Sequence, residues 1–252
     1  MSSSNHAAVA LDTLPREHRQ IQRVIPIVSP QFIPAERLAE RPDWCAEFGR
    51  SAPLALEIGC GTGHFILQRA AQQPETDFLA IDIYNKGCLK TCRKLAAARL
   101  SNVRVVRVEA RELLVKAIPA ESLQAIYINC PDPWPKQRHR DRRLVNRDFL
   151  ALALYRLLPD GDVFFSSDCH DYAEQVANAL AALPGFTNQL EQPYVGQLPG
   201  YPLSKYMRRF LGQGLPLHFI HHRRNPAVSL PVPVDPDLQR GFRARRPGTG
   251  DA

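Results

Sequence analysis

The chain has 252 residues, of which 44% are hydrophobic, and carries a formal net charge of +7 at pH 7. This length can bury one substantial core, or at most two small ones. No apolar run approaches the roughly 18 residues of a membrane span, and the first twenty residues lack the basic and apolar regions of a secretory signal. We therefore expect a cytoplasmic globular protein without a membrane partner, whose excess of cations favours a polyanionic partner.

The two ends of the chain differ in composition from the segment between them. Residues 1–23 are polar and show no periodicity, so a flexible N-terminal segment is expected. Residues 225–252 are rich in Pro, Gly and Arg, which is typical of a disordered tail. Residues 24–224 are therefore predicted to form the folded domain.

Within this domain, short apolar runs alternate with helical patterns. Strands are expected at 54–59, 77–82, 103–108, 123–129 and 161–168, followed in turn by helices at 63–73, 85–100, 110–118, 146–158 and 171–183. A late strand is expected near 217–224. Strands separated by helices form right-handed βαβ units. The pattern therefore predicts an α/β fold with a doubly wound, mostly parallel sheet in a three-layer sandwich.

The first predicted strand runs into a glycine-rich turn, EIGCGTGHF. Gly59 and Gly61 let the backbone turn tightly and approach a ligand without an intervening Cβ. The dinucleotide fingerprint G-x-G-x-x-G would need a glycine where this chain has His64. Glu57, directly before the turn, would repel a phosphate but suits an ammonium or sulfonium group. The turn therefore argues against a pyrophosphate-binding NAD site.

Polar residues also follow the second and third predicted strands. Asp82 lies about 20 residues past the glycine turn, where an acid accepts both ribose hydroxyls. Glu109 and Ala110 end the third strand, near the expected edge of an adenine. The chain has no G-x-x-x-x-G-K-[ST] motif for ATP. Together these features indicate an adenosine ligand without phosphate, and S-adenosylmethionine fits.

The fourth predicted strand ends in NCPDPWP, where Asp132 and Trp134 stand between prolines. Proline lacks a backbone N–H, and it disfavours helical geometry in the preceding residue and favours an extended one. We therefore expect an extended backbone at these residues and a rigidly held carboxylate at the edge where substrate meets the methyl donor. A rigid surface turn without function is the alternative.

A cluster of cationic residues follows this motif. Residues 136–147 contain six Lys or Arg, with Asp141 as the one acid among them. They alternate too closely with polar residues to form an amphipathic core helix. Beside a reaction centre, they indicate a segment that binds nucleic-acid phosphates. A solvated charge run is the alternative.

Four segments, LEIGCGTG, AIDIYNKG, PDPWPKQRHRDRRL and SSDCHDYAE, carry a family resemblance. In their order and spacing they are similar to the bacterial tRNA (guanine-N7-)-methyltransferases, over residues 54–219. PDPW followed by K-x-R-H and R-R-L is specific to that family, whereas the glycine turn indicates only a methyltransferase. The resemblance implies a Rossmann-like class I methyltransferase that uses S-adenosylmethionine to methylate guanine N7 at position 46, in the variable loop of tRNA.

The resemblance and the motifs together assign roles to individual residues. Asp132 is the implied catalytic residue. Cofactor contacts are expected from Glu57, Gly59, Gly61, Asp82, Glu109, Ala110 and Asp132. Substrate contacts are expected from Lys136, Arg138, His139, Arg140, Arg142, Arg143, Asp168, Ser204 and Tyr206. No metal site is expected, and the implied state is a monomer or weak homodimer that binds tRNA.

One position departs from the family pattern. Where relatives carry T-[KE]-[YF]-E near the C-terminus, this chain has SKYM, residues 204–207. Ser204 keeps a hydroxyl, but Met207 replaces a carboxylate that is expected to hydrogen-bond the guanine. Asp82, where many relatives have Glu, is a milder change. The Met207 change is expected to affect substrate binding.

The expected chemistry needs positioning more than proton transfer. Guanine N7 has an in-plane lone pair, so the methyl group can be transferred without a base. A carboxylate that accepts from N1–H and N2–H binds the cationic transition state better than the ground state. We assign this role to Asp132, supported by Asp168.

Two alternatives stay open. The first is a methyltransferase for another RNA base or an exocyclic amine, whose [DN]-P-P-[YFW] loop NCPDPW partly matches. The second is a non-catalytic RNA-binding relative, which Met207 could suggest. Elsewhere, Cys88 and Cys92 are interpreted as buried thiols and Trp44 as a packing residue.

Overall fold

A computed structural model describes residues 25–233 of the protein. The predicted flexible segment 1–23 lies outside the described residues, and so does the predicted tail from residue 234 onward. Residues 225–233 form a loop after the last strand, in which Asn225 donates its N–H to Gly185 O at 2.8 Å and Leu230 packs against the core.

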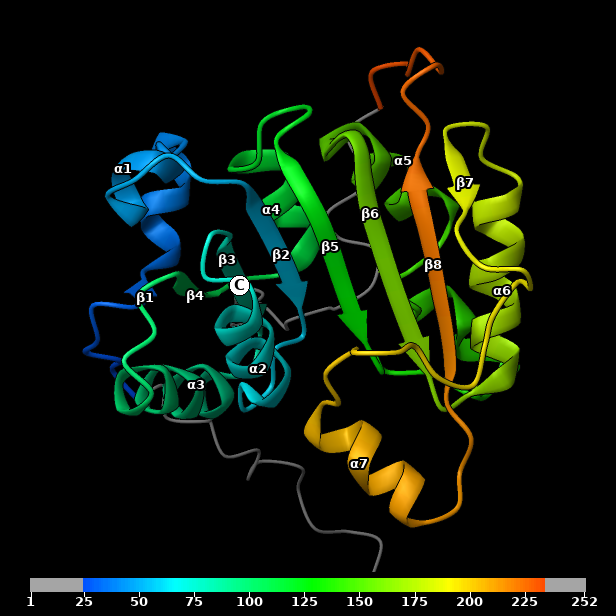
Figure 1. Ribbon diagram of the computed structural model, residues 1–252, viewed down its shortest axis with the longest axis horizontal. Helices are drawn as coiled ribbons and strands as arrows, with labels where there is room; N and C mark the ends of the chain where they lie inside the picture. Colours follow the sequence, from blue (N-terminus) through cyan, green and yellow to red (C-terminus); the bar gives the residue numbers. More distant parts are fainter. Residues whose placement is uncertain (1–24, 234–252) are drawn as a thin grey trace, which may run out of the picture.

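The fold is built on one eight-stranded sheet (Figure 1) with the order β1-β4-β3-β2-β5-β6-β8-β7. The strands are β1 (Phe32–Ile33), β2 (Leu54–Ile58), β3 (Asp77–Asp82), β4 (Val103–Arg107), β5 (Leu123–Asn129), β6 (Leu157–Ser167), β7 (Phe186–Asn188) and β8 (His218–Arg224). The first six strands pair in parallel, whereas β8 is antiparallel to both β6 and β7. This confirms the predicted doubly wound, mostly parallel sheet.

Helices cover both faces of this sheet. They are η1 (Ala35–Glu40), α1 (Trp44–Phe48), α2 (His64–Gln72), α3 (Asn85–Ala97), α4 (Ala110–Lys116), η2 (Gln137–Arg142), α5 (Arg147–Arg156), α6 (His170–Ala181) and α7 (Lys205–Gly212). Buried residues of α4, α5 and α6 share one core cluster, and those of α2, α3 and α7 share another. The three layers follow from this division, with α2, α3 and α7 together on one face (Figure 1).

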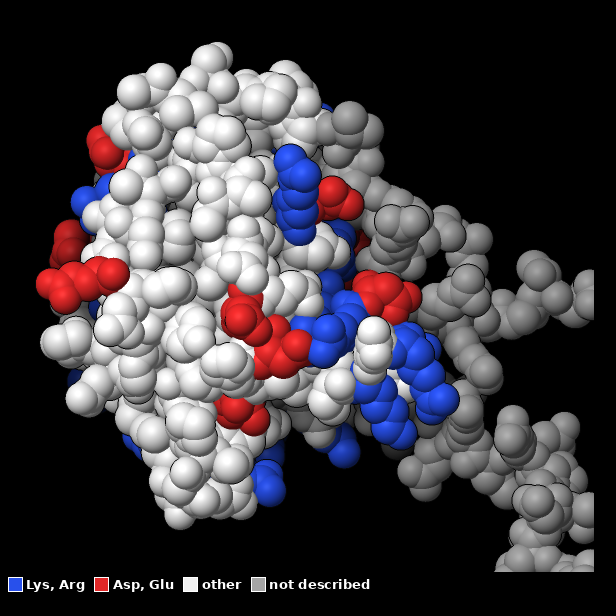
Figure 2. All heavy atoms as spheres, turned by 90° about the vertical axis from the view of Figure 1, so that its right-hand side faces the viewer, with Lys and Arg blue, Asp and Glu red and all other residues white. Residues whose placement is uncertain are grey.

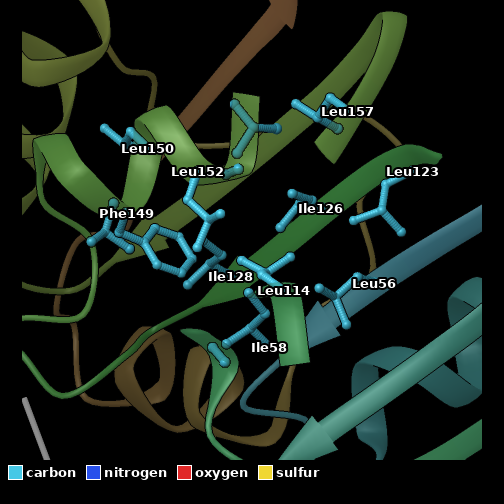
Figure 3. Packing of buried hydrophobic residues seen from close by; sticks show 14 of the residues in the cluster. Leu56, Ile58, Leu114, Leu123, Ile126, Ile128, Phe149, Leu150, Leu152 and Leu157 are labelled. Atoms are coloured by element: carbon cyan, nitrogen blue, oxygen red, sulfur yellow. The ribbon is translucent and has the colours of Figure 1, made fainter. Parts of the chain in front are cut away.

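The strands alternate between these two cores. Leu56 and Ile58 of β2 pack in the first cluster, where Figure 3 shows them beside Leu114 of α4 and Ile126 and Ile128 of β5. Ala55 of the same strand joins the second cluster. Because successive side chains of a strand point to opposite faces, these fully buried strands read as continuous apolar runs. Glu57 of β2 therefore faces the side of the sheet that α2, α3 and α7 cover.

The predicted elements are found with shifts at their ends, and several short elements were not predicted. Helix α5 ends at Arg156 and β6 starts at Leu157, four residues earlier than expected, with a register shift against β5. Strands β1 and β7 and helices α1 and α7 have too few residues, or too little periodicity, for a clear pattern. Their place comes from packing against the sheet.

Two predictions about packing residues are confirmed. Trp44 is buried, and its indole Nε1 donates to Ala117 O at 3.0 Å. Cys88 and Cys92 are buried free thiols on the inner face of α3. Among residues 25–233, no helix is both long and apolar enough to span a lipid bilayer.

Candidate functional site

The predicted site residues converge on one edge of the sheet. Strands β2, β3, β4, β5 and β6 are parallel, so their carboxyl ends share this edge (Figure 1). Glu57, Asp82, Glu109, Asp132 and Asp168 lie at or just after these five ends. In open α/β sheets ligands bind in the crevice at this edge, so the arrangement is that of a ligand site.

The glycine turn after β2 is held in a conformation that needs glycine. Gly59, Gly61 and Gly63 have φ values of 78°, 55° and 78°, which residues with a Cβ rarely adopt. An added Cβ at Gly59 or Gly61 would meet nothing within 4 Å. The turn therefore presents bare backbone to open space, as close approach by a ligand requires.

Glu57 is a buried carboxyl without a hydrogen-bond partner for one oxygen. Glu57 is only 1% exposed, and no group in the described part of the chain donates to its Oε2. Burial raises the pKa of Glu57 to about 8, the Asn129 amide partly offsets this, and the charge of Asp82 adds to it. An unpaired buried acid is costly unless a ligand supplies a cation or donor. Glu57 therefore fits the ammonium group of S-adenosylmethionine.

Asp82 ties β3 to the glycine turn. Its Oδ2 accepts from Gly61 N–H at 2.7 Å and its Oδ1 from Tyr84 N–H at 2.8 Å. Burial raises the pKa of Asp82, the Tyr84 and Gly61 N–H groups oppose this, and the charge of Asp132 raises the pKa further. Each carboxylate oxygen can accept a second hydrogen bond. Asp82 thus remains able to accept from ribose hydroxyls.

Glu109 has a structural partner that the sequence did not predict. It is the N-cap of α4, where Oε2 accepts from Arg111 N–H at 2.7 Å and Glu112 N–H at 3.1 Å. Its Oε1 accepts from the Arg111 guanidinium at 3.2 Å, and Ala110 beside it is buried. A cap of this kind stabilises the helix start. The predicted contact of Glu109 and Ala110 with an adenine stays a prediction.

A buried network at the end of β5 was missed by the sequence analysis. Asn129 Oδ1 accepts from Tyr201 Oη at 2.8 Å and from Ser166 Oγ at 3.3 Å. These two hydroxyls fix the orientation of the amide, whose Nδ2 lies near enough to Glu57 to lower its pKa but forms no hydrogen bond of good geometry among the described residues. The sequence signal for this network was one polar residue, Asn129, at the end of an apolar strand. The network connects the loop before α7 to the carboxyl ends of β5 and β6.

The loop after β5 is strained, contrary to the expectation of extended backbone. Cys130 and Trp134 each precede a proline, yet they have φ values of 47° and 41°. Non-glycine residues with such φ values are uncommon and persist where surrounding contacts hold them. The preference of a pre-proline residue is therefore overridden here. Rigidity was predicted, but it comes from tertiary contacts rather than from the prolines alone.

Arg143 supplies those contacts, and here the prediction of a substrate contact is wrong. Its side chain is 0% exposed. The guanidinium donates to Pro133 O at 2.8 Å, Gln175 Oε1 at 2.6 Å and Asp171 Oδ2 at 2.6 Å, and stacks over the Tyr172 ring at 4.7 Å. Arg143 therefore clamps the Asp132 loop onto α6 and is not available to RNA.

Asp132 itself is exposed and lies near the cofactor edge. Its neighbours Pro131 and Pro133 are half-buried, and Pro133 is held by the Arg143 clamp. Its charge raises the pKa of Asp82, so the two carboxylates lie within electrostatic reach of each other. Asp132 therefore lies at the same edge of the sheet as Glu57 and Asp82.

The remaining cations of the segment are accessible, as expected for substrate contacts. Lys136, Arg138, Arg140 and Arg142 are exposed and His139 is half-buried, within or next to η2. The Arg142 guanidinium lies 5.0 Å from the Trp134 ring centroid, and the His139 ring meets that ring edge-on at 5.8 Å. Arg140 pairs with Asp171 at 2.7 Å. The Trp134 ring thus packs against two residues of this cationic segment.

The SKYM segment explains the departure at Met207. Ser204 is the N-cap of α7, and its Oγ accepts from Met207 N–H at 3.2 Å while Met207 Sδ accepts from Ser204 N–H at 3.2 Å. Met207 is fully buried, whereas Tyr206 is 54% exposed. The sulfur takes the acceptor place that Glu has in a capping box. The expectation that the change to Met207 affects substrate binding stays a prediction.

Asp168 lies at the carboxyl end of β6, at the same edge of the sheet. Asp168 is half-buried directly after β6, and its charge raises the pKa of Cys130 on the adjacent loop, where burial is the larger cause. It also lies near His218 at the start of β8, whose pKa is lowered chiefly by burial. The structure therefore places Asp168 next to the Asp132 loop.

Comparisons with known proteins agree with this arrangement. Residues 51–220 match a family model described as "Putative methyltransferase". A tRNA (guanine-N(7)-)-methyltransferase of Syntrophotalea carbinolica is 55% identical over 222 residues, which cover 88% of this chain and 96% of the relative. The protein of the same name from Geobacter metallireducens is 51% identical over 205 residues, covering 81% and 97%.

A solved structure, the 16S rRNA methyltransferase KamB, has the same fold. It superposes with a TM-score of 0.53 at 16% identity, covering 76% of this chain and 92% of that one. At this identity the likeness concerns the fold.

Proposed function

This chain belongs to the tRNA (guanine-N7-)-methyltransferase family, and on that premise we propose that it methylates guanine N7 at position 46, in the variable loop of tRNA. It is an S-adenosylmethionine-dependent enzyme. We further propose that it acts in the cytoplasm as a monomer or weak homodimer. The proposal about the nucleotide rests on the resemblance of the PDPWPKQRH segment.

The cofactor residues fit S-adenosylmethionine by their chemistry. When bound, it supplies an electrophilic methyl group on a sulfonium centre. Glu57 would hold the ammonium group, the bare backbone at Gly59 and Gly61 would line the cofactor, and Asp82 would hold the ribose. Glu57 Oε2, buried without a partner in the described residues, is the observation behind this assignment.

Asp132 is proposed as the catalytic residue. Positive charge arrives on the purine as N7 is alkylated, which makes N1–H and N2–H stronger donors. A carboxylate that accepts hydrogen bonds from these two groups therefore binds the transition state more tightly than the ground state. The observation that carries this role is an exposed carboxylate on a clamped loop, close enough to raise the pKa of Asp82.

The remaining substrate residues are proposed to position the RNA. Asp168, beside the Asp132 loop, would support the guanine. Lys136, Arg138, Arg140 and Arg142 would contact phosphates, because each is exposed. Holding the acceptor and the donor in line is the main source of rate here, since guanine N7 needs no base.

A single-turnover methylation assay on unmodified tRNA transcript tests the role of Asp132. Asp132→Ala is expected to lower the rate by about 100-fold or more, the range found when one transition-state hydrogen-bonding group is removed. Asp141→Ala, which removes an exposed carboxylate of the same segment, is the matched control and should keep most of the rate. Calorimetry should show that Asp132→Ala still binds S-adenosylmethionine. A rate within threefold of the unaltered protein would remove Asp132 from the mechanism.

A further inference from the structure

Helix α3 carries a row of like charges along its outer face. Lys86, Lys90 and Lys94 follow one another at intervals of four residues, which places them on one side of the helix. The opposite side, including Cys88 and Cys92, is buried against the sheet. Like charges at this spacing destabilise a helix. The row therefore costs helix stability, and of its three lysines only Lys94 has a hydrogen bond within the described residues that offsets this cost.

Cations of a second helix converge on the end of this row. Lys94 Nζ donates to Thr62 O at 2.8 Å and lies 3.3 Å from the His64 ring at the start of α2. Burial lowers the pKa of Lys94, and Lys205, Lys90 and Arg208 lower it further. Lys205 and Arg208 belong to α7, so this helix brings two cations within electrostatic reach of Lys94 on α3. We call Lys90, Lys94, Lys205 and Arg208 the α3/α7 cation cluster.

The cluster is not neutralised by carboxylates. None of its four members forms an ion pair with another residue in the range 25–233. The pKa of His64 is also lowered, first by burial and then by Lys94, Arg208 and Lys205. By contrast, Arg140 beside the catalytic loop is paired with Asp171. Figure 2 views the molecule from the right-hand side of Figure 1 and shows basic and acidic side chains mixed on that side. Concentrated, unpaired positive charge fits a polyanion.

An exposed aromatic ring stands beside these cations. Tyr206, next to Lys205, is 54% exposed, and Tyr84 is 46% exposed at the N-terminus of α3, near Lys86. Aromatic rings between cations are typical of surfaces that bind single-stranded nucleic acid, because the bases can stack on them. The combination favours RNA over other polyanions.

The cluster lies on the other side of the sheet edge from the η2 cations. Helices α3 and α7 belong to the core on one face. The segment after η2 packs on the other face, where Leu144 O accepts from Arg111 of α4 at 3.0 Å and Val145 N–H donates to Tyr172 of α6 at 2.9 Å. The glycine turn and the Asp132 loop follow strands β2 and β5, whose carboxyl ends form the sheet edge that separates these two faces.

We propose that the α3/α7 cation cluster is a second phosphate-binding surface for tRNA, so that the RNA straddles the carboxyl edge of the sheet. Its backbone is held by α3 and α7 on one face and by the η2 segment on the other, with the target guanine between them. This inference rests on the proposed function. It adds an RNA-binding surface whose residues all lie outside the PDPWPKQRH segment.

Salt-dependent tRNA binding of the full chain tests this surface. The triple variant Lys90→Gln, Lys205→Gln and Arg208→Gln removes three cations that are exposed. Its tRNA dissociation constant should rise at least tenfold at low salt. The slope of log Kd against log salt should fall by about 2 to 3, because each lost phosphate contact removes about 0.7 to 0.9.

A matched triple variant controls for net charge. Arg41→Gln, Arg99→Gln and Lys116→Gln also remove three exposed cations, after η1 and at the ends of α3 and α4 away from the site. This variant should keep both the Kd and most of the slope. Both variants should bind S-adenosylmethionine as the unaltered protein does, which shows that the fold and the cofactor site persist.

Chemical labelling of lysines in the unaltered protein gives a second readout. Addition of tRNA should protect Lys90 and Lys205 from an amine-reactive reagent and leave Lys116 reactive. If the unaltered protein binds and methylates tRNA while the first triple variant keeps its Kd and these lysines stay reactive, the surface is wrong and the proposed function stands. If the unaltered protein does not bind tRNA, the proposed function fails first.

Discussion

The proposed cofactor side and the proposed substrate side of the sheet edge are held in place in different ways. On the cofactor side, the backbone of the strands and the glycine turn fixes the groups directly, as when Gly61 N–H donates to Asp82 at 2.7 Å. On the substrate side, the Asp132 loop follows an unfavourable path, with positive φ at Cys130 and Trp134, and a buried arginine from beyond η2 holds it. The cofactor side is therefore predictable from local sequence, whereas the substrate side depends on distant contacts.

The largest effect is expected from removing the Arg143 side chain that holds the Asp132 loop. Arg143→Ala deletes three hydrogen bonds and leaves the Asp132 loop without its support. We expect a loss of about 2–3 kcal/mol in the free energy of unfolding, less than the roughly 3–5 kcal/mol of a fully buried pair because the Asp171 side chain is 42% exposed. Single-turnover methylation should fall by about 100-fold, as misplacement of a reacting group does.

Arg142→Ala is the matched control for the clamp. Its guanidinium is exposed and contacts Trp134, so urea unfolding should change by about 0.5 kcal/mol or less. An Arg143→Ala protein with unaltered stability and rate would show that the strained loop holds itself.

The next largest effect is expected at Glu57, on the proposed cofactor side. Because its pKa is raised to about 8, the carboxyl is mostly protonated at neutral pH and must lose its proton to hold an ammonium group. Cofactor affinity should therefore rise about tenfold per pH unit from about pH 6 to about pH 7.5. Titrations in buffers of different ionisation enthalpy should show the release of close to one proton at pH 7. Glu57→Gln should bind more weakly and lose this pH dependence.

The same shift predicts a pH effect on stability. The folded protein holds a proton on Glu57 that the unfolded chain releases near its ordinary pKa of 4.5. Without cofactor, this contribution is present below that pH and is lost as the pH rises through about 8. Thermal unfolding should therefore show a smaller decline over this range in Glu57→Gln. A decline equal to that of the unaltered protein would contradict the raised pKa.

The smallest effect is expected at Met207. Met207→Leu conserves volume in a buried position and removes the sulfur that accepts from Ser204 N–H. The free energy of unfolding should fall by less than about 1.5 kcal/mol, and the KM for tRNA should stay within twofold. A tenfold rise in KM would instead mean that the sulfur contacts the substrate.

Much of the fold followed from the sequence because its signals are local. Each buried strand is a short apolar run bounded by polar residues, and Glu57 and Asp82 stand at the ends of such runs. The burial of Arg143 could not be read this way, since its partners Asp171 and Gln175 lie about 30 residues further along the chain. The positive φ values in the loop run against the preference of pre-proline residues, so local rules predicted the opposite conformation.

The most direct test of the account is to map the methyl group on tRNA. The protein is incubated with labelled S-adenosylmethionine and unmodified tRNA transcript, and the product is treated with borohydride and aniline, which cleave at N7-methylguanosine. We expect cleavage at one nucleotide, guanine 46, and loss of that cleavage in Asp132→Ala. Incorporation of label without cleavage, or cleavage at another guanine, would contradict it.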